Sequence, residues 1–321
     1  MILITGAAGF IGSHLTEKLL DSGEKIVGID NLCDFYDIEL KKYNLEIIKK
    51  NENADKFIFI EEDIRNLNGL ETIFNNFPID TIIHLAAMAG VRPSIEDPIL
   101  YQEVNVRGTQ NLLECSKKNN VKKFIFASSS SVYGNNKKIP FAETDNVDHP
   151  ISPYAATKKA GELLCYTYHE IYDIDMICLR FFTVYGPRQR PDLAIHKFAR
   201  MVNQKKPIPF YGDGTTARDY TFINDIVDGL KKSLKWIREN TNIYEIINLG
   251  NNEPVKLSRL VEVISNHFNY EIVINRQPIP KGDVMITFAD ISKARNLFGY
   301  DPKTSIESGL DEFFKWFHSY Y

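Results

Sequence analysis

The first 181 residues alternate short apolar runs with segments of helical pattern, and this alternation constrains the fold more than any other feature of the chain. The apolar runs are nearly continuous, which is typical of parallel strands buried on both faces. The expected strands are 2–5, 25–30, 56–61, 80–86, 122–128 and 175–181. The expected helices include 11–22, 37–50, 66–76, 97–119 and 153–173. This order predicts an α/β fold with a doubly wound parallel sheet.

The rhythm breaks after about residue 181, where proline and glycine become denser and the later segments are shorter and mixed. We therefore expect two domains. The larger one, a doubly wound (Rossmann) domain, covers 1–180, and 222–250 returns to it. The smaller one is C-terminal, has a mixed α/β structure and covers 181–221 and 251–321.

Composition narrows the class of protein. The chain has 321 residues with 38 basic and 42 acidic side chains, and its net charge of −4 argues against nucleic-acid binding, which needs a basic excess. The four cysteines are widely spaced, so we expect neither a metal site nor a disulfide framework. Because no apolar run approaches the ~20 residues of a membrane span, we expect a cytoplasmic protein without a membrane partner.

The sequence TGAAGFIGSHL, residues 5–15, joins the first expected strand to the first expected helix. Its Gly6, Gly9 and Gly12 permit a tight turn, close approach of a pyrophosphate and close helix–strand packing. A plain glycine-rich turn is the simpler interpretation, but the strand–turn–helix setting favours dinucleotide binding. Asp30 ends the second expected strand, where a carboxylate binds ribose hydroxyls, and no basic residue follows it directly. The sequence therefore predicts NAD rather than NADP.

The pattern Tyr-x-x-x-Lys occurs twice, as Tyr133/Lys137 and Tyr154/Lys158. The first pair runs into a Gly-Asn-Asn turn, whereas the second lies just inside an expected helix, where residues four apart are neighbours. An ammonium beside a phenol lowers the phenol's pKa from ~10 towards neutral pH. The resulting phenolate can take a hydroxyl proton while hydride leaves the same carbon. A Tyr and a Lys on a helix surface are the alternative, which a preceding dinucleotide motif disfavours.

A serine-rich segment, ASSSSVYG at 127–134, follows the fifth expected strand, at the sheet edge where ligands bind. One serine can hydrogen-bond the reacting oxygen, although a serine-rich turn that caps a helix explains most of the four. Together these motifs resemble the extended short-chain dehydrogenase/reductase superfamily and, within it, the nucleotide-sugar 4-epimerases. The resemblance extends nearly end to end and includes GIDNL, EDIRN, HLAA, NVRGTQNLL, RFFTVYGPRQRPD, ARDYTFINDIVDG, NLGN and GDV.

The resemblance implies roles on the cofactor side of the site. Tyr154 would be the catalytic acid and base, Lys158 its pKa partner and a ribose ligand, and Ser129 the hydroxyl that assists. NAD would be tightly bound and regenerated in each turnover. Besides Tyr154 and Lys158, its implied contacts are Gly6, Gly9, Phe10, Ile11, Gly12, Asp30, Asn31, Asp63, Ile64, Leu85, Ala86, Ala87 and Asn105.

The resemblance also implies a UDP-sugar substrate and a partner chain. The implied substrate contacts are Ser129, Ser130 and Thr183 at the sugar, Tyr211 at the uracil, Arg218 at the diphosphate and Asp283 at the uridine ribose. Many relatives carry an arginine three residues before this aspartate, whereas this chain has Pro280, followed by Lys281. A homodimer is implied because the helices matching 97–119 and 153–173 pair into a four-helix bundle in this superfamily.

The serine-rich segment also bears on the reaction. Dehydratases that resemble this fold carry an Asp-Glu pair just after the serine or threonine, because elimination of water needs an extra acid and base. Decarboxylases commonly carry a glutamate there. This chain has Ser130 and Ser131 instead. We therefore expect epimerisation, which needs only oxidation at C4, turnover of the 4-keto sugar and hydride return to the opposite face.

The sugar is indicated by residues 29–47, 88–94 and 185–192, which resemble the subgroup that acts on UDP-glucuronic acid. A planar guanidinium binds a carboxylate through two hydrogen bonds, so we expect Arg190 at the sugar 6-carboxylate. Arg188 is a second candidate whose role stays open, and solvated loop charges are the alternative for both. The expected reaction interconverts UDP-glucuronic acid and UDP-galacturonic acid. The alternatives are a UDP-glucose or UDP-N-acetylglucosamine 4-epimerase and a non-catalytic NAD-binding scaffold or sensor.

Overall fold

The structure, a computed structural model, describes residues 1–278 and 284–321. Its centre is a seven-stranded sheet in the order β10-β6-β5-β4-β1-β2-β3, with every neighbouring pair parallel. Its strands are β1 (Ile2–Thr5), β2 (Ile26–Asp30), β3 (Phe57–Glu61), β4 (Thr81–His84), β5 (Lys123–Ser129), β6 (Asp175–Phe181) and β10 (Tyr244–Leu249). The predicted fold class is confirmed, and the six expected strands match β1 to β6 within two residues at each end.

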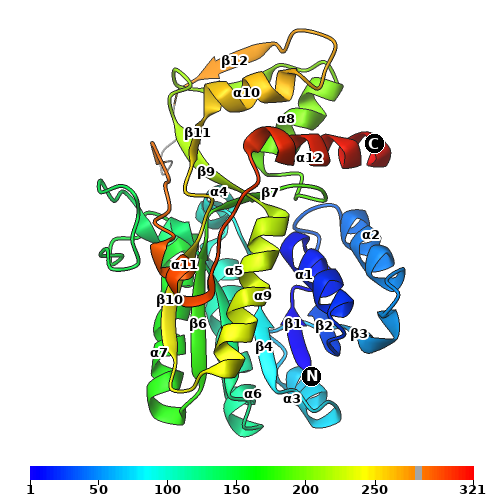
Figure 1. The fold of residues 1–321 in the computed structure, drawn as a ribbon, viewed down its shortest axis with the longest axis vertical. Coiled ribbons are helices and arrows are strands. Elements are labelled where there is room, and N and C mark those ends of the chain that lie inside the picture. The colour runs from blue at the N-terminus through cyan, green and yellow to red at the C-terminus, as the bar shows by residue number, and fades with distance from the viewer. Residues whose placement is uncertain (279–283) are drawn as a thin grey trace.

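Helices cover both faces of this sheet (Figure 1). They are α1 (Phe10–Asp21), α2 (Ile38–Lys49), α3 (Leu67–Asn76), α4 (Val91–Glu96), α5 (Pro98–Gln102), α6 (Gly108–Lys118), α7 (Pro153–Tyr172), α9 (Ile223–Glu239) and α11 (Ser292–Phe298). The sheet separates two hydrophobic clusters, and β1 contributes Ile2 and Ile4 to one and Leu3 to the other. Because alternate residues of a strand point to opposite faces, a strand covered on both sides is apolar throughout.

A smaller part of the chain lies above the large sheet in Figure 1. A three-stranded sheet has the order β11-β9-β7, and a two-stranded sheet pairs β12 with β8. These strands are β7 (Thr183–Tyr185), β8 (Ile208–Tyr211), β9 (Ala217–Phe222), β11 (Pro254–Lys256) and β12 (Ile274–Gln277). The helices α8 (Ala194–Asn203), α10 (Leu257–Ser265) and α12 (Ile306–Tyr320) lie beside them.

The chain crosses between these two parts more than once. After β9 it returns to the large sheet, where α9 packs beside α1 and β10 pairs in parallel with β6. It then leaves again for β11 and α10, and α11 later packs against α9 and β10. The segment between β6 and β9 therefore lies over the carboxyl ends of the parallel strands.

The predicted helix 97–119 differs from the structure in one respect. It is divided into α5 and α6 by a π-helical turn, Glu103–Arg107. Inside this turn the buried Asn105 donates from Nδ2 to the Met88 carbonyl at 2.9 Å and to Thr157 Oγ1 at 3.0 Å. The widened turn therefore places a polar side chain that ties three segments together, and π turns commonly occur near functional sites.

A buried ion pair lies under the carboxyl end of β5. Glu162 of α7 accepts from Arg180 of β6 through both carboxylate oxygens, at 2.8 and 2.9 Å, and from the hydroxyl of Ser128 at 2.7 Å. Both charged side chains are at most 1% exposed. The pair thus joins α7, β5 and β6 directly beneath the serine-rich segment.

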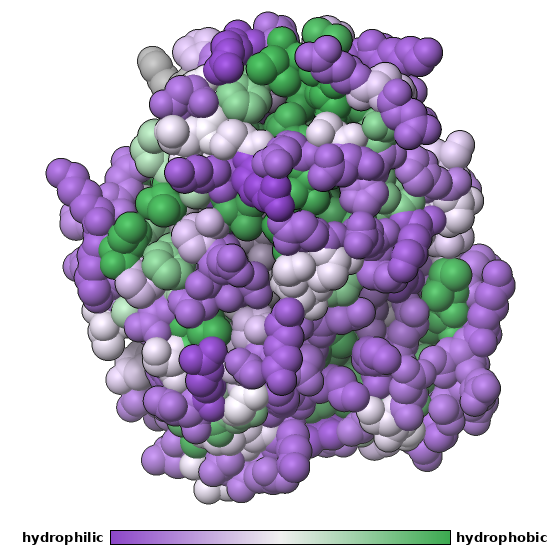
Figure 2. Space-filling model, turned by 45° about the horizontal axis from the view of Figure 1, so that its top comes forward, coloured by the Kyte–Doolittle hydropathy of each residue, from purple (hydrophilic) through white to green (hydrophobic). Residues whose placement is uncertain are grey.

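The molecular surface is mainly polar on the face shown in Figure 2, where hydrophobic residues gather in separate small patches. Within residues 1–278 and 284–321, no helix is long and apolar enough to cross a membrane.

Candidate active site

A cavity of about 740 Å³ opens at the carboxyl ends of the parallel strands. Strand order reverses between β1 and β4, and ligands of open α/β sheets bind at such a reversal. The predicted site residues that line the cavity are Gly6, Gly9, Phe10, Ile11, Gly12, Asp30, Asn31, Asp63, Ile64, Leu85, Ala86, Ala87, Ser129, Ser130, Tyr154, Lys158, Thr183, Arg190 and Arg218. Residues separated by more than 200 positions in the chain therefore meet in one place.

The glycine turn is shaped by two close approaches of the backbone. Gly6 has φ of +72°, where side chains are rarely accommodated. A Cβ on Gly12 would lie 2.1 Å from the Gly6 carbonyl oxygen, so only glycine lets α1 start this close to β1. Gly9 is the N-cap of α1 and offers no side-chain hydrogen bond to the first turn. The backbone N–H groups of this helix end can therefore bind a pyrophosphate.

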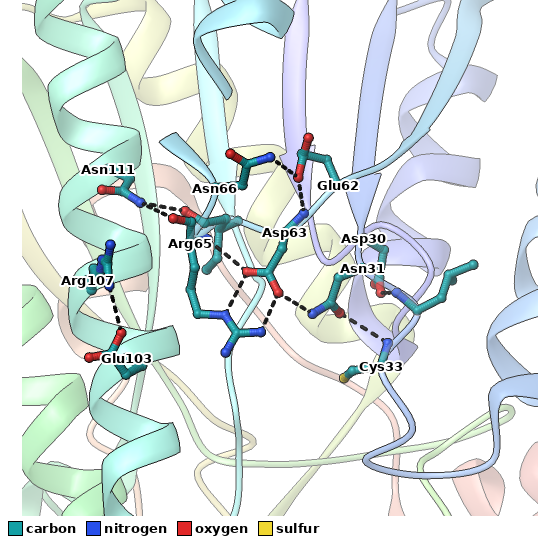
Figure 3. A network of polar contacts seen from close by, with 12 residues as sticks. Asp30, Asn31, Cys33, Glu62, Asp63, Arg65, Asn66, Glu103, Arg107 and Asn111 are labelled. Atoms are coloured by element: carbon teal, nitrogen blue, oxygen red, sulfur yellow. Dashed lines mark hydrogen bonds and ion pairs between the residues drawn. The ribbon is translucent and has the colours of Figure 1, made fainter. Parts of the chain in front are cut away.

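Acidic and amide side chains follow β2 and β3 at the cavity wall (Figure 3). Asn31 Nδ2 donates to Asp63 Oδ2 at 2.8 Å, and Arg65 donates to both Asp63 oxygens at 3.0 and 2.7 Å. The hydrogen bonds from Arg65, followed by that from Asn31, lower the pKa of Asp63 to about 2 despite partial burial. Asp63 is thus an ionised hydrogen-bond acceptor at neutral pH.

Lys41 belongs to this wall, although no sequence pattern indicates it. Its ammonium lies 3.3 Å from Asp30 Oδ1, the two side chains are 6% and 7% exposed, and both residues line the cavity. In sequence, Lys41 is one of several lysines in an amphipathic helix, where most lysines face solvent. No general rule predicts that an Asp at the end of a strand contacts a Lys eleven residues later. Only the folded chain, in which α2 packs against α1, brings them together.

The Tyr154–Lys158 pair lies at the start of α7, as expected. Ser152 caps this helix by accepting from the Ala155 N–H at 3.1 Å, and Pro153 occupies its first position. The Lys158 ammonium donates to the Ala127 carbonyl at 2.7 Å and lies 6.0 Å from the centre of the Tyr154 ring. Burial lowers the pKa of Lys158 to about 7.

The expected lowering of the tyrosine pKa by Lys158 is wrong. Burial raises the pKa of Tyr154, and the groups that oppose this rise are Ser129, through a hydrogen bond, and Arg190, through its positive charge. Burial also lowers the pKa of Lys158, which weakens its protonation and so its effect on the phenol. In the other Tyr-x-x-x-Lys pair the two side chains point to different places. The Tyr133 hydroxyl is buried and donates to Asn248, whereas Lys137 is exposed.

The serine-rich segment turns away from β5 at the cavity. Ser129 is the last residue of the strand, and its hydroxyl oxygen accepts from the Ser131 N–H at 3.2 Å to start the 3-10 turn Ser130–Tyr133. The Ser131 Oγ is buried without a hydrogen-bond partner among the described residues. Ser128, Ser129, Ser130 and Ser131 all line the cavity, and of these the Ser128 hydroxyl is taken up by a hydrogen bond to Glu162. One strand end therefore brings three hydroxyls to the site.

The two arginines of residues 185–192 have different surroundings. Arg190 lines the cavity, donates to both Asp192 oxygens at 3.0 and 2.6 Å, and lies 5.0 Å from the Phe35 ring centre. Arg188 does not line it, because its guanidinium is ion-paired with Glu17 at 2.6 Å. Arg188, whose role the sequence left open, thus lies outside the cavity lining and contacts α1.

Three further residues expected at the site are not among those that line the cavity. Asn105 is buried behind it, where it holds Met88 and Thr157, and so it is not a lining residue. Tyr211 does not line it either; the Arg92 guanidinium lies 5.0 Å from its ring centre. Asp283 lies outside the described residues, as does Pro280. Among the residues that are described, no group of three or more His, Cys, Asp or Glu side chains could hold a metal ion.

The cavity, glycine turn and Tyr–Lys pair define an extended short-chain dehydrogenase/reductase, and comparison with known proteins identifies the family. A family model described as GDP-mannose 4,6 dehydratase matches residues 3–313, and the chain belongs to this family. The UDP-glucuronate 4-epimerase of Thermodesulfobacterium geofontis is 46% identical over 315 residues, which cover 98% of this chain and 95% of that protein.

Solved structures show the same similarity. The UDP-glucuronic acid 4-epimerase of Bacillus cereus, in complex with UDP-glucuronic acid and NAD, has a TM-score of 0.92 and 38% identity, and covers 100% of this chain and 99% of its own. The UDP-glucose 4-epimerase of Thermotoga maritima, with UDP-glucose, has a TM-score of 0.88 and 32% identity, and covers 99% of each chain.

Proposed function

We propose that this protein is an NAD-dependent UDP-glucuronate 4-epimerase. It interconverts UDP-glucuronic acid and UDP-galacturonic acid through an enzyme-bound 4-keto sugar. The observation that carries the proposal is the meeting of Tyr154, Ser129 and Arg190 in one cavity with the glycine turn. The relatives named for this activity support the acid sugar, since they match the chain over nearly its whole length.

The cavity residues fit NAD. The glycine turn has no room for a side chain at Gly12, and no side chain caps the start of α1, which suits a pyrophosphate. Asp30 stands at the end of β2 to accept from ribose hydroxyls, and Asn31, Asp63 and Ile64 extend this wall. Bound NAD supplies a reversible acceptor for the hydride that leaves C4.

The chemistry assigned to the protein is a proton transfer at the sugar O4. Tyr154 takes the hydroxyl proton on oxidation and returns it on reduction, and Ser129 hydrogen-bonds the same oxygen. Lys158 holds a cofactor ribose and supplies positive charge when it is protonated. Since the pKa of Lys158 is about 7 and that of Tyr154 is raised, the neutral phenol is the resting form.

The reaction class is supported by the two residues directly after Ser129. An eliminating enzyme needs a further acid and base, and these positions hold Ser130 and Ser131, which supply neither. The family description refers to a dehydratase, but it covers the family and not each member's reaction. Hydroxyls suffice for epimerisation.

The acid sugar is supported by Arg190. Two of its nitrogens bind Asp192, while its Nη1 has no hydrogen-bond partner among the described residues, so donors remain for a carboxylate. Its side chain is only 15% exposed, and burial strengthens such a pair. Oxidation at C4 also creates a β-keto acid, and an arginine that fixes the carboxylate can suppress loss of CO₂.

The nucleotide end of the substrate belongs to the smaller part of the chain. We assign Thr183 to the sugar, Arg218 to the diphosphate, Tyr211 to the uracil and Asp283 to the uridine ribose. Thr183 and Arg218 line the cavity, which supports the first two assignments. We accordingly assign NAD binding to 1–180 with 222–250, and nucleotide-sugar binding to 181–221 and 251–321.

We further propose a homodimer in the cytoplasm. Exposed hydrophobic side chains lie on two helices that pack together, Ile99 on α5 and Leu163 and Tyr166 on α7. A second copy of the same face would bury them by two-fold symmetry. All four cysteines are free thiols, which suits a reducing compartment.

Replacement of Arg190 tests the choice of sugar. We expect Arg190→Ala to lower kcat/KM for UDP-glucuronic acid about 10- to 100-fold, since a charge-assisted contact to the carboxylate is lost. Arg200→Ala, an exposed arginine of α8, is the matched control and should leave it unchanged. If the unaltered protein turned over UDP-glucose as well as UDP-glucuronic acid, the acid-sugar assignment would be wrong. Absence of turnover with every UDP-sugar would favour a non-catalytic NAD-binding protein.

A further inference from the structure

Arg188 combines an unusual backbone conformation with a nearly buried ion pair. Its φ is +63°, in the left-handed region that residues other than glycine seldom adopt. Its Nη1 donates to Glu17 Oε1 at 2.6 Å, and the two side chains are 8% and 25% exposed. A residue keeps such a conformation where its surroundings hold it, often near a ligand site.

The backbone of residues 187–191, around Arg188, is also restricted by prolines and by buried hydrogen bonds. Pro187 and Pro191 restrict φ on either side. Gln189 is 1% exposed, its Nε2 donates to the Val184 carbonyl at 3.1 Å, and its own carbonyl oxygen contacts the ring of His196. Arg190 follows directly and extends into the cavity. The position of its guanidinium therefore depends on how this short segment is anchored.

The anchor lies on the helix of the cofactor site. Glu17 is in α1, whose first residues form the cavity wall, but Glu17 itself does not line the cavity. His14, also in α1, lies near Arg188. Burial, together with the charge of Arg188, holds the pKa of His14 well below its usual value. The histidine is therefore neutral, and Arg188 is the cation that neutralises Glu17.

We propose that the Arg188–Glu17 ion pair is a positioning device that ties the segment carrying Arg190 to α1. It fixes the distance between the cofactor wall and the group that binds the sugar carboxylate. Arg188 is thus a positioning residue and not a substrate ligand. This inference rests on the proposed function, because it assigns to Arg190 the carboxylate of UDP-glucuronic acid.

Glu17→Ala is the sharpest test, because Glu17 does not line the cavity and alanine preserves the helix. In a Tyr154→Phe background, which prevents turnover, calorimetry measures the Kd of UDP-glucuronic acid and of UDP. We expect Glu17→Ala to weaken UDP-glucuronic acid about three- to tenfold, with UDP affinity and bound NAD unchanged. Lys18→Ala is the matched control, since it removes an exposed ion pair from the same helix.

A double-variant cycle shows whether the effect passes through Arg190. Once Arg190→Ala is present, Glu17→Ala should cause no further loss of UDP-glucuronic acid affinity. Arg188→Lys should retain part of the affinity lost in Arg188→Gln. The inference is overturned if Glu17→Ala behaves like Lys18→Ala, if UDP weakens by the same factor, or if the two losses add. Failure of the proposed function is distinguished from these outcomes, because the unaltered protein would then not turn over UDP-glucuronic acid.

Discussion

Tyr154 is the single side chain on which the proposed chemistry depends most. Tyr154→Phe removes the proton-transferring oxygen and keeps the ring, so we expect turnover to fall at least about 100-fold while the melting temperature stays nearly unchanged. A coupled product assay and a thermal shift measure the two quantities. Tyr166→Phe, an exposed tyrosine on the same helix, should retain full activity. Substantial activity in Tyr154→Phe would transfer the acid–base role to another group.

At the same scale, the predictable residues are those with a local signature. The glycines and the Tyr154–Lys158 pair follow from spacing along a strand, turn or helix. Lys41 and the true partner of Arg188 do not, because each is defined by a contact with a distant segment. The pKa of Tyr154 cannot be predicted locally for a related reason, since burial by the whole cavity outweighs one neighbouring lysine.

The Glu162–Arg180 pair is a buried contact that joins α7 to β6 beneath the site. Glu162→Ala would leave the Arg180 charge buried without its partner, and we expect the free energy of unfolding to fall by about 3–5 kcal/mol. Urea denaturation measures this loss. Glu170→Ala, an exposed glutamate of α7, should change stability by less than about 0.5 kcal/mol. Equal effects of the two substitutions would show that the pair contributes little.

Elements with strong periodicity are predicted well, and those shaped by polar contacts are not. The apolar runs of β1 to β6 match the sheet because both faces are covered. The π turn before α6 escapes prediction, since it serves the hydrogen bonds of Asn105 to Met88 and Thr157. The short helix α4 also escapes it, because six residues give too little pattern to detect.

For the whole molecule, the assembly is the property to test. Ile99→Asp combined with Leu163→Asp would place charges in the proposed two-fold interface, and we expect sedimentation equilibrium to shift from dimer to monomer. Glu170→Lys is the control on the same helix and should leave the dimer intact. Lys159 is not used because its ammonium lies 3.6 Å from Glu162. A monomeric unaltered protein, or a dimer unaffected by both aspartates, would contradict this interface.

The fold class is predictable from the order of strands and helices, because that order admits few topologies. The pairing partner and register of β10 with β6 depend on long-range contacts that local patterns do not contain. The chemistry of the site is predictable in part. Its motifs can be read in the sequence, but their common cavity exists only in the folded chain.

The most direct test of the proposed function is product analysis with UDP-glucuronic acid and no added NAD. NMR of the nucleotide sugars should show UDP-galacturonic acid approaching equilibrium with the substrate, without release of CO₂, because the cofactor stays bound and Arg190 holds the carboxylate. A pentose product with stoichiometric CO₂, a dehydrated sugar, or no conversion by NAD-loaded protein would contradict the account.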